Sequence, residues 1–222
     1  RQANPKRVVL IFVDTLRPDH MGVYGYERQT TPFLDSWAKG GTTFTEARTI
    51  APWTLPSYRS MLTGRYPNRW NSTLPIQEQL QSRGWSTAFF AGNVYLSSNF
   101  EGARGWGIHY AHLDSNATEQ VNRATRWLEN QDGRNTFIML HLMDPHLPYR
   151  EPTAYRRLFA GAAPKGLPKR FTRRSVLQAS GLDKSAHQYI RDRYDNNLKF
   201  VDDELKRFYS NLRDDDLVIF VS

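Results

Sequence analysis

The hydrophobic positions of this chain fall into short apolar runs that alternate with amphipathic stretches. Runs rich in β-branched or aromatic residues predict buried strands at 7–13, 86–91, 136–141 and 217–221, with a shorter candidate at 42–45. Apolar residues three or four positions apart, together with proline and glycine signals, predict helices at 32–39, from near Ser57 to Gly64, at 76–82, at 118–129, and along a stripe between 190 and 212. Strands that alternate with helices predict an α/β fold with a mostly parallel central sheet and helices on both faces.

Composition narrows the class of protein without naming an activity. The chain has 222 residues, of which 39% are hydrophobic and 13% aromatic, which is typical of an ordered domain. It contains no cysteine, which excludes disulfides and cysteine-ligated metals. No apolar run reaches the roughly 18 residues that a membrane span needs.

The net charge of +8 favours anionic partners. Basic residues crowd the segment 165–174, inside a stretch at 151–185 that we interpret as a basic loop insertion. A solvated basic loop and an anion-binding loop explain this segment equally well. Nucleic acid is supported only by the charge, because no nucleic-acid-binding motif is present.

Three segments combine residues that can carry chemistry. Asp14 follows the first strand, where a carboxylate can hold a metal ion or cap a turn. Thr54 stands just ahead of a helix start that we place at Pro56, so its hydroxyl either attacks a charged ester near the positive end of the helix or only caps the helix. His146, in a cluster that follows another strand, is suited to contact an anion or to protonate a leaving group.

Taken together, these segments resemble the sulfatase-like hydrolases of the alkaline phosphatase superfamily. The similarity runs through nearly the whole chain in order: VLIFVDTLRPDHMG at 9–22, YGY at 24–26, TTPFLD at 30–35, APWTLPSYRSMLTG at 51–64, DPHLPY at 144–149 and, more weakly, YDNNL at 194–198. It implies an alkaline-phosphatase-like fold, with Thr54 and His146 catalytic and with Asp14 and Thr54 as ligands of a divalent metal ion (Ca, Zn or Mn). Asn93 and Arg59 are the implied substrate-binding residues.

Departures from the family pattern shape the expected mechanism. Sulfatases of this kind oxidise a Cys or Ser to formylglycine, whereas Thr54 cannot become that aldehyde and resembles the direct nucleophile of phosphoryl-transferring members. Tyr58 replaces the usual Arg or His beside the nucleophile. Asn93 occupies a place where sulfatases often have a Lys.

Relatives follow the last strand with Asp-His-Gly or Asp-Asn-Gly, two residues of which bind metal. The sequence stops at Ser222, so we expect a C-terminal segment or a second polypeptide to complete the site. The chain is then the N-terminal portion, 1–222, of a catalytic domain that hydrolyses a sulfate or phosphate ester through a covalent intermediate on Thr54. Two alternatives are a phospho-headgroup transferase and a catalytically dead relative that binds anionic glycans. The resemblance favours a periplasmic, secreted or membrane-tethered protein.

Overall fold

The computed structural model describes residues 6–222 except 71–72, 101, 166, 168–171 and 173–181. The chain divides into two compact units. Unit 1 comprises 1–13, 46–143 and 211–222, and unit 2 comprises 14–45 and 144–210. In the part of the chain that the structure describes, no helix is both long enough and apolar enough to cross a membrane.

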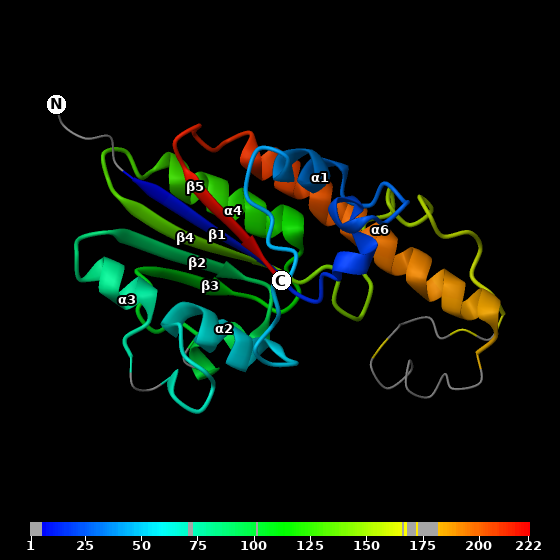
Figure 1. Ribbon diagram of the computed structural model, residues 1–222, viewed down its shortest axis with the longest axis horizontal. Coiled ribbons are helices and arrows are strands. Elements are labelled where there is room, and N and C mark those ends of the chain that lie inside the picture. Colours follow the sequence, from blue (N-terminus) through cyan, green and yellow to red (C-terminus); the bar gives the residue numbers. More distant parts are fainter. Residues whose placement is uncertain (1–5, 71–72, 101, 166, 168–171, 173–181) are drawn as a thin grey trace. The chain divides into compact units, whose positions relative to one another are not determined.

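Unit 1 is built on a sheet of five strands (Figure 1). The spatial order is β3–β2–β4–β1–β5, and every neighbouring pair is parallel. Val9 of β1 lies beside Ile138 of β4 on one side and Val218 of β5 on the other. The strands are β1 (Arg7–Val13), β2 (Ser86–Ala91), β3 (Ile108–Ala111), β4 (Thr136–Leu142) and β5 (Leu217–Val221).

Helices cover both faces of this sheet, because side chains alternate between the faces along each strand. Phe12, Phe89 and Met139 form one cluster with Tyr58 and Leu62 of α2. The intervening strand residues point to the opposite face, where α4 contacts β2 and β4. The helices of this unit are α2 (Thr54–Thr63), α3 (Ile76–Gln81) and α4 (Ala117–Glu129), with the short 3-10 turns η4 (Val94–Leu96) and η5 (Ser98–Phe100).

Unit 2 is organised by the long helix α6 (Lys184–Tyr209), against which α1 (Pro32–Ala38) packs. The turns η1 (Pro18–His20) and η2 (Gly22–Tyr24) precede α1. Asp202 of α6 accepts hydrogen bonds from the backbone N–H groups of Phe33 and Leu34, each at 2.9 Å. A buried carboxylate from a distant helix therefore caps α1.

The structure confirms the predicted fold class and corrects three local predictions. The strand candidate at 42–45 is wrong, since these residues are exposed and have no ladder partner. The edge strand β3 was missed, because a half-exposed strand of four residues carries little hydrophobic pattern. Helix α2 begins at Thr54 rather than near Ser57.

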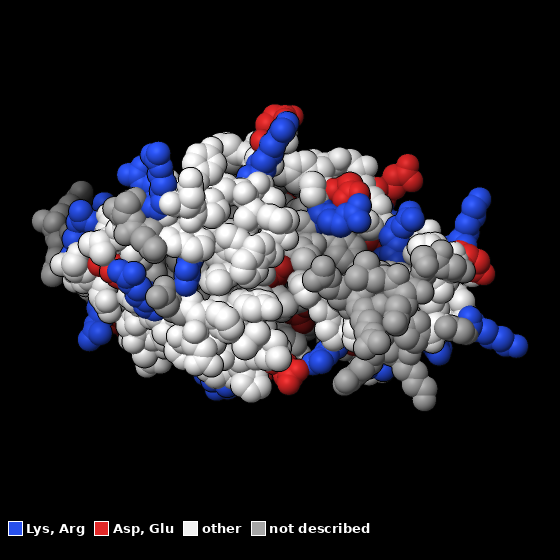
Figure 2. Space-filling view, turned by 90° about the horizontal axis from the view of Figure 1, so that it is seen from below, with Lys and Arg blue, Asp and Glu red and all other residues white. Residues whose placement is uncertain are grey.

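The crowded segment 165–174 of the predicted basic loop lies largely outside the described residues: among its cations, only Lys165 is described. On the face seen in Figure 2, the described Lys and Arg side chains are dispersed, with acidic side chains among them. Among the described residues, this face therefore shows no single basic patch.

Candidate functional site

Thr54 is the first residue of α2, and Trp53 before it is the extended N-cap residue, with φ −156° and ψ 161°. The predicted helix start at Pro56, with Thr54 ahead of the helix, is wrong. The N–H groups of the first helical turn have no partner within the helix, so a proline at the third position loses no hydrogen bond. The Thr54 hydroxyl lies at the positive end of the helix dipole in either case.

Asn93 is brought to Thr54 by the loop that follows β2. Its Nδ2 donates to Thr54 Oγ1 at 3.3 Å, while its Oδ1 accepts the backbone N–H of Tyr95 at 2.9 Å. The second bond fixes the orientation of the amide, because only the amide oxygen can accept a hydrogen bond. Asn93 is 5% exposed, so it is a preoriented neutral donor aimed at the predicted nucleophile.

Tyr58 does not act as the Arg or His that relatives have beside the nucleophile. It is 3% exposed and stacks on Phe89, with ring centroids 5.4 Å apart. Its hydroxyl accepts from Trp106 Nε1 at 3.0 Å and donates to the carbonyl of Gly102 at 3.1 Å. Burial raises the pKa of the Tyr58 hydroxyl, so it stays protonated as this core network requires.

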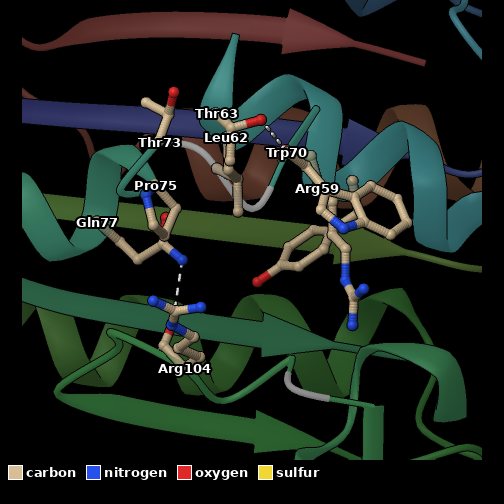
Figure 3. Close-up of a pocket in the computed structure, with 9 residues that line it drawn as sticks. Arg59, Leu62, Thr63, Trp70, Thr73, Pro75, Gln77 and Arg104 are labelled. Carbon is tan, nitrogen blue, oxygen red and sulfur yellow. Dashed lines mark hydrogen bonds between the residues drawn. The ribbon is translucent and has the colours of Figure 1, made fainter. Parts of the chain in front are cut away.

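Arg59 lines a pocket to which Thr54 does not contribute (Figure 3). Five residues of α-helix turn the side chain by about 140° from Thr54. Its guanidinium lies 4.6 Å from the ring centroid of Trp70 and donates to the carbonyl of Phe100 at 3.2 Å. Substrate binding by Arg59 stays a prediction.

Asp14 directly follows β1 and is 6% exposed. The next residue, Thr15, has φ +57°, a left-handed conformation that is strained for a β-branched side chain. Within unit 2, the Tyr194 hydroxyl donates to the Thr15 carbonyl at 2.8 Å and accepts from the Arg17 N–H at 2.9 Å. Tyr194 therefore holds the turn that carries Asp14, a role that the sequence pattern did not reveal.

His146 belongs to unit 2 and is partly exposed. Its Nδ1 lies 2.6 Å from the carbonyl oxygen of Leu147. Because a carbonyl can only accept, Nδ1 carries the proton, and in the neutral ring Nε2 is the acceptor. His146 can thus take a proton at Nε2 or, once protonated, give one from there.

The metal ligands implied by the resemblance are present only in part. A buried carboxylate after a strand suits a hard, oxygen-ligated cation, and Asp14 meets that requirement. Within the described ranges, however, no group of three or more His, Cys, Asp or Glu residues is arranged to hold a metal ion. Metal binding by Asp14 therefore stays a prediction, and the described residues alone form no complete ligand set.

The fold places the chain among alkaline-phosphatase-like sulfatase structures. It matches a Bacteroides fragilis protein assigned to the sulfatases (yidJ) with a TM-score of 0.74 at 18% identity, over 99% of this chain and 62% of that one. The periplasmic domain of EptC from Escherichia coli, solved with Zn, matches with a TM-score of 0.72 at 20% identity, over 94% and 59%.

The Sulfatase family model matches residues 6–222, so the chain belongs to the Sulfatase family. It is 35% identical to arylsulfatase A of Homo sapiens over 135 residues, which cover 50% of this chain and 26% of that protein. An arylsulfatase of Clostridium perfringens is 30% identical over 153 residues, which cover 60% and 32%. The chain thus spans about a quarter to a third of the length of these relatives.

Proposed function

We propose that the intact protein cleaves a sulfate or phosphate ester through a covalent intermediate on Thr54. The observation that carries the proposal is the contact of 3.3 Å between Asn93 Nδ2 and Thr54 Oγ1 at the first residue of α2. A hydroxyl placed at the positive end of a helix and next to a fixed donor is suited to bear developing negative charge. Membership of the Sulfatase family supports the same reaction class.

The reaction requires two displacements. Thr54 Oγ1 attacks sulfur or phosphorus in line and releases its proton to solvent, the bond to the alcohol oxygen breaks, and that oxygen leaves with a proton that we assign to Nε2 of the protonated His146, whose ring regains a proton from solvent before the next cycle. Water then attacks the same atom, the bond to Thr54 breaks, and the threonine hydroxyl is regenerated. The Asn93 amide donates to the threonine oxygen and stabilises its charge whenever the bond to the central atom is partial.

A divalent cation, with Asp14 as one ligand, would lower the pKa of the attacking hydroxyl and polarise the ester. We propose that the other ligands lie outside the described residues. Arg59 is proposed only to contact a more distant part of an anionic substrate.

A phospho-headgroup transferase is the second candidate, and the threonine itself favours it. Thr54 cannot be oxidised to the aldehyde that the resemblance implies for sulfatases. The fold also matches EptC of Campylobacter jejuni, described as a phosphoethanolamine transferase, with a TM-score of 0.69 at 18% identity, over 93% of this chain and 63% of that one. A transferase would share the first displacement and replace water by an acceptor alcohol in the second.

The test compares Thr54→Ala and Thr54→Ser in the intact protein. We expect Thr54→Ala to abolish turnover and Thr54→Ser to retain a measurable part of it, because serine keeps the hydroxyl. Thr63→Ala, at the other end of α2, is the matched control, since the Thr63 hydroxyl has local backbone partners: it donates to the carbonyl of Arg59 and accepts from the N–H of Arg65. Turnover that survives in Thr54→Ala would contradict the proposal.

Intact mass after rapid quenching should show a sulfo or phospho adduct on the wild type but not on Thr54→Ala. Added acceptor alcohols separate the two candidate functions. Transfer to the alcohol that exceeds release of free anion supports the transferase, and release that is insensitive to the alcohol supports the hydrolase.

A further inference from the structure

Three exposed aromatic side chains of unit 1 form a continuous surface, which we call the aromatic platform: Trp53, Tyr95 and Phe100. They are 53%, 44% and 37% exposed, respectively. The rings of Trp53 and Tyr95 are 5.9 Å apart at 85°, and those of Tyr95 and Phe100 are 5.2 Å apart at 68°. The rings touch one another edge to face while remaining open to solvent, so together they offer one apolar surface to a ligand.

The platform is fixed to the predicted nucleophile through the backbone. Trp53 immediately precedes Thr54, so their Cα atoms are about 3.8 Å apart. Asn93 donates to Thr54 Oγ1 with one end of its amide and accepts the N–H of Tyr95 with the other. One buried side chain thus positions the hydroxyl and the middle ring of the platform together.

Charge next to the platform suits an anionic ligand. The guanidinium of Arg59 donates a hydrogen bond to the backbone carbonyl of Phe100 at 3.2 Å. Thr54 lies at the positive end of α2, beside the platform's first ring. A molecule that combines an apolar ring with an anionic ester would meet complementary chemistry at both points.

We propose that the aromatic platform binds the leaving group of the ester and selects leaving groups that are rings with a flat apolar face. The inference rests on the proposed function of Thr54 and names the part of the substrate that lies next to it. Because Trp53 and Thr54 are adjacent, the ring in question is the one that carries or directly neighbours the ester oxygen. An aryl ring and a pyranose ring share this chemistry, since either presents a face to an aromatic side chain.

The experiment measures binding without turnover. In the intact protein carrying Thr54→Ala, calorimetry gives the dissociation constants of 4-nitrophenyl sulfate, glucose 6-sulfate and n-hexyl sulfate, and of the corresponding phosphates. We expect at least one ring ester to bind about fivefold or more tightly than the acyclic hexyl ester. The aryl and sugar esters distinguish the two sources of a ring.

Adding Trp53→Ala or Tyr95→Ala should reduce the preference for the ring ester to less than about twofold. Tyr66→Ala is the matched control, because Tyr66 is 71% exposed in the same unit and is not part of the platform, and it should leave the preference unchanged. Circular dichroism checks that each variant is folded, which we expect because the substituted side chains are exposed.

Equal affinity for cyclic and acyclic esters would overturn the platform proposal, as would a ring preference that survives both platform substitutions. Absence of any turnover by the protein with Thr54 intact would instead overturn the proposed function. The two failures are therefore read from separate measurements.

Discussion

The substitution Tyr58→Phe separates a structural role for this residue from a catalytic one. The resemblance places Tyr58 where relatives have a basic side chain beside the nucleophile. In this chain the Tyr58 ring is buried against Phe89, and its hydroxyl joins Trp106 to Gly102. Removing that single oxygen leaves the ring and its stacking in place, so no large cavity forms.

The magnitude follows from the two partners that lose the hydroxyl. The indole N–H of Trp106, which is 7% exposed, would be left as a buried donor, at a cost of about 1–3 kcal/mol. The Gly102 carbonyl loses a hydrogen bond with a net value of about 1 kcal/mol. We therefore expect the free energy of unfolding to fall by about 2–4 kcal/mol.

Urea denaturation of the intact protein, followed by tryptophan fluorescence, measures this change. The m-value should be unchanged, because the surface exposed on unfolding is the same. The control is Tyr66→Phe: Tyr66 is 71% exposed, and its substitution should cost less than about 0.5 kcal/mol. At a temperature well below unfolding, Tyr58→Phe should keep kcat within about twofold of wild type. A loss of stability no greater than that of Tyr66→Phe, or a large loss of kcat in the folded variant, would refute the reasoning.

Three further predictions concern other parts of the chain. Burial raises the pKa of Asp202 to about 6 from its usual 3.8, so the folded state binds the proton more tightly than the unfolded state does. The free energy of unfolding therefore falls as the pH rises through these two values, by about 3 kcal/mol in all. Denaturation at pH 4 and pH 7 should show most of this loss in the wild type and not in Asp202→Asn. Asp195→Ala removes the carboxylate that binds a histidine, a tyrosine and an arginine, and it should lower the free energy of unfolding by about 3–5 kcal/mol. The control Asp19→Ala breaks an exposed ion pair and should lower it by less than about 1 kcal/mol in the same assay. Asn93→Ala should lower kcat by about a hundredfold and cost about 1 kcal/mol of stability through the lost bond to the Tyr95 N–H. Asn93→Asp keeps that acceptor but should not restore kcat, because a carboxylate cannot donate; a variant with kcat within threefold of wild type would contradict the role given to Asn93.

The central strands could be predicted from the sequence because their signal is local. Strands β1, β2 and β5 have the predicted bounds, and β4 is one residue longer. Each is a short apolar run, and for β1, β2 and β4 burial on both faces leaves little ambiguity about such a run. The predicted burial of β5 is wrong, because β5 lies at the edge of the sheet and its residues Leu217 and Ile219 are exposed. The edge strand β3 has a covered side and an open side, so its four residues, one of them His109, do not form a continuous apolar run.

The polar contacts that shape the candidate site could not be predicted in the same way. Tyr194 reaches the turn after Asp14 from 177 to 179 residues away along the chain, and Asp202 reaches α1 from 168 to 169 residues away. Hydrophobic periodicity reports the face on which a residue lies, but not the group that it meets there. The sequence marked the long helix as an amphipathic stripe, while the buried acids on it became informative only with their partners.

The contrast between Tyr58 and Asn93 explains how this chain departs from the pattern that it resembles. A cation at position 58 would replace a side chain that is 3% exposed and fills the space between α2 and the sheet. Burying an unpaired charge there would cost several kcal/mol, so the packing of the core itself opposes an Arg at this position. Asn93 reaches Thr54 from the loop after β2, where its amide is already fixed by the N–H of Tyr95. A neutral donor next to the hydroxyl stabilises developing charge without raising the charge of the site, and it joins the nucleophile to the aromatic rings beside it. On the proposed function, the described groups around Thr54 would therefore orient an ester and its leaving group more than they would neutralise the anion.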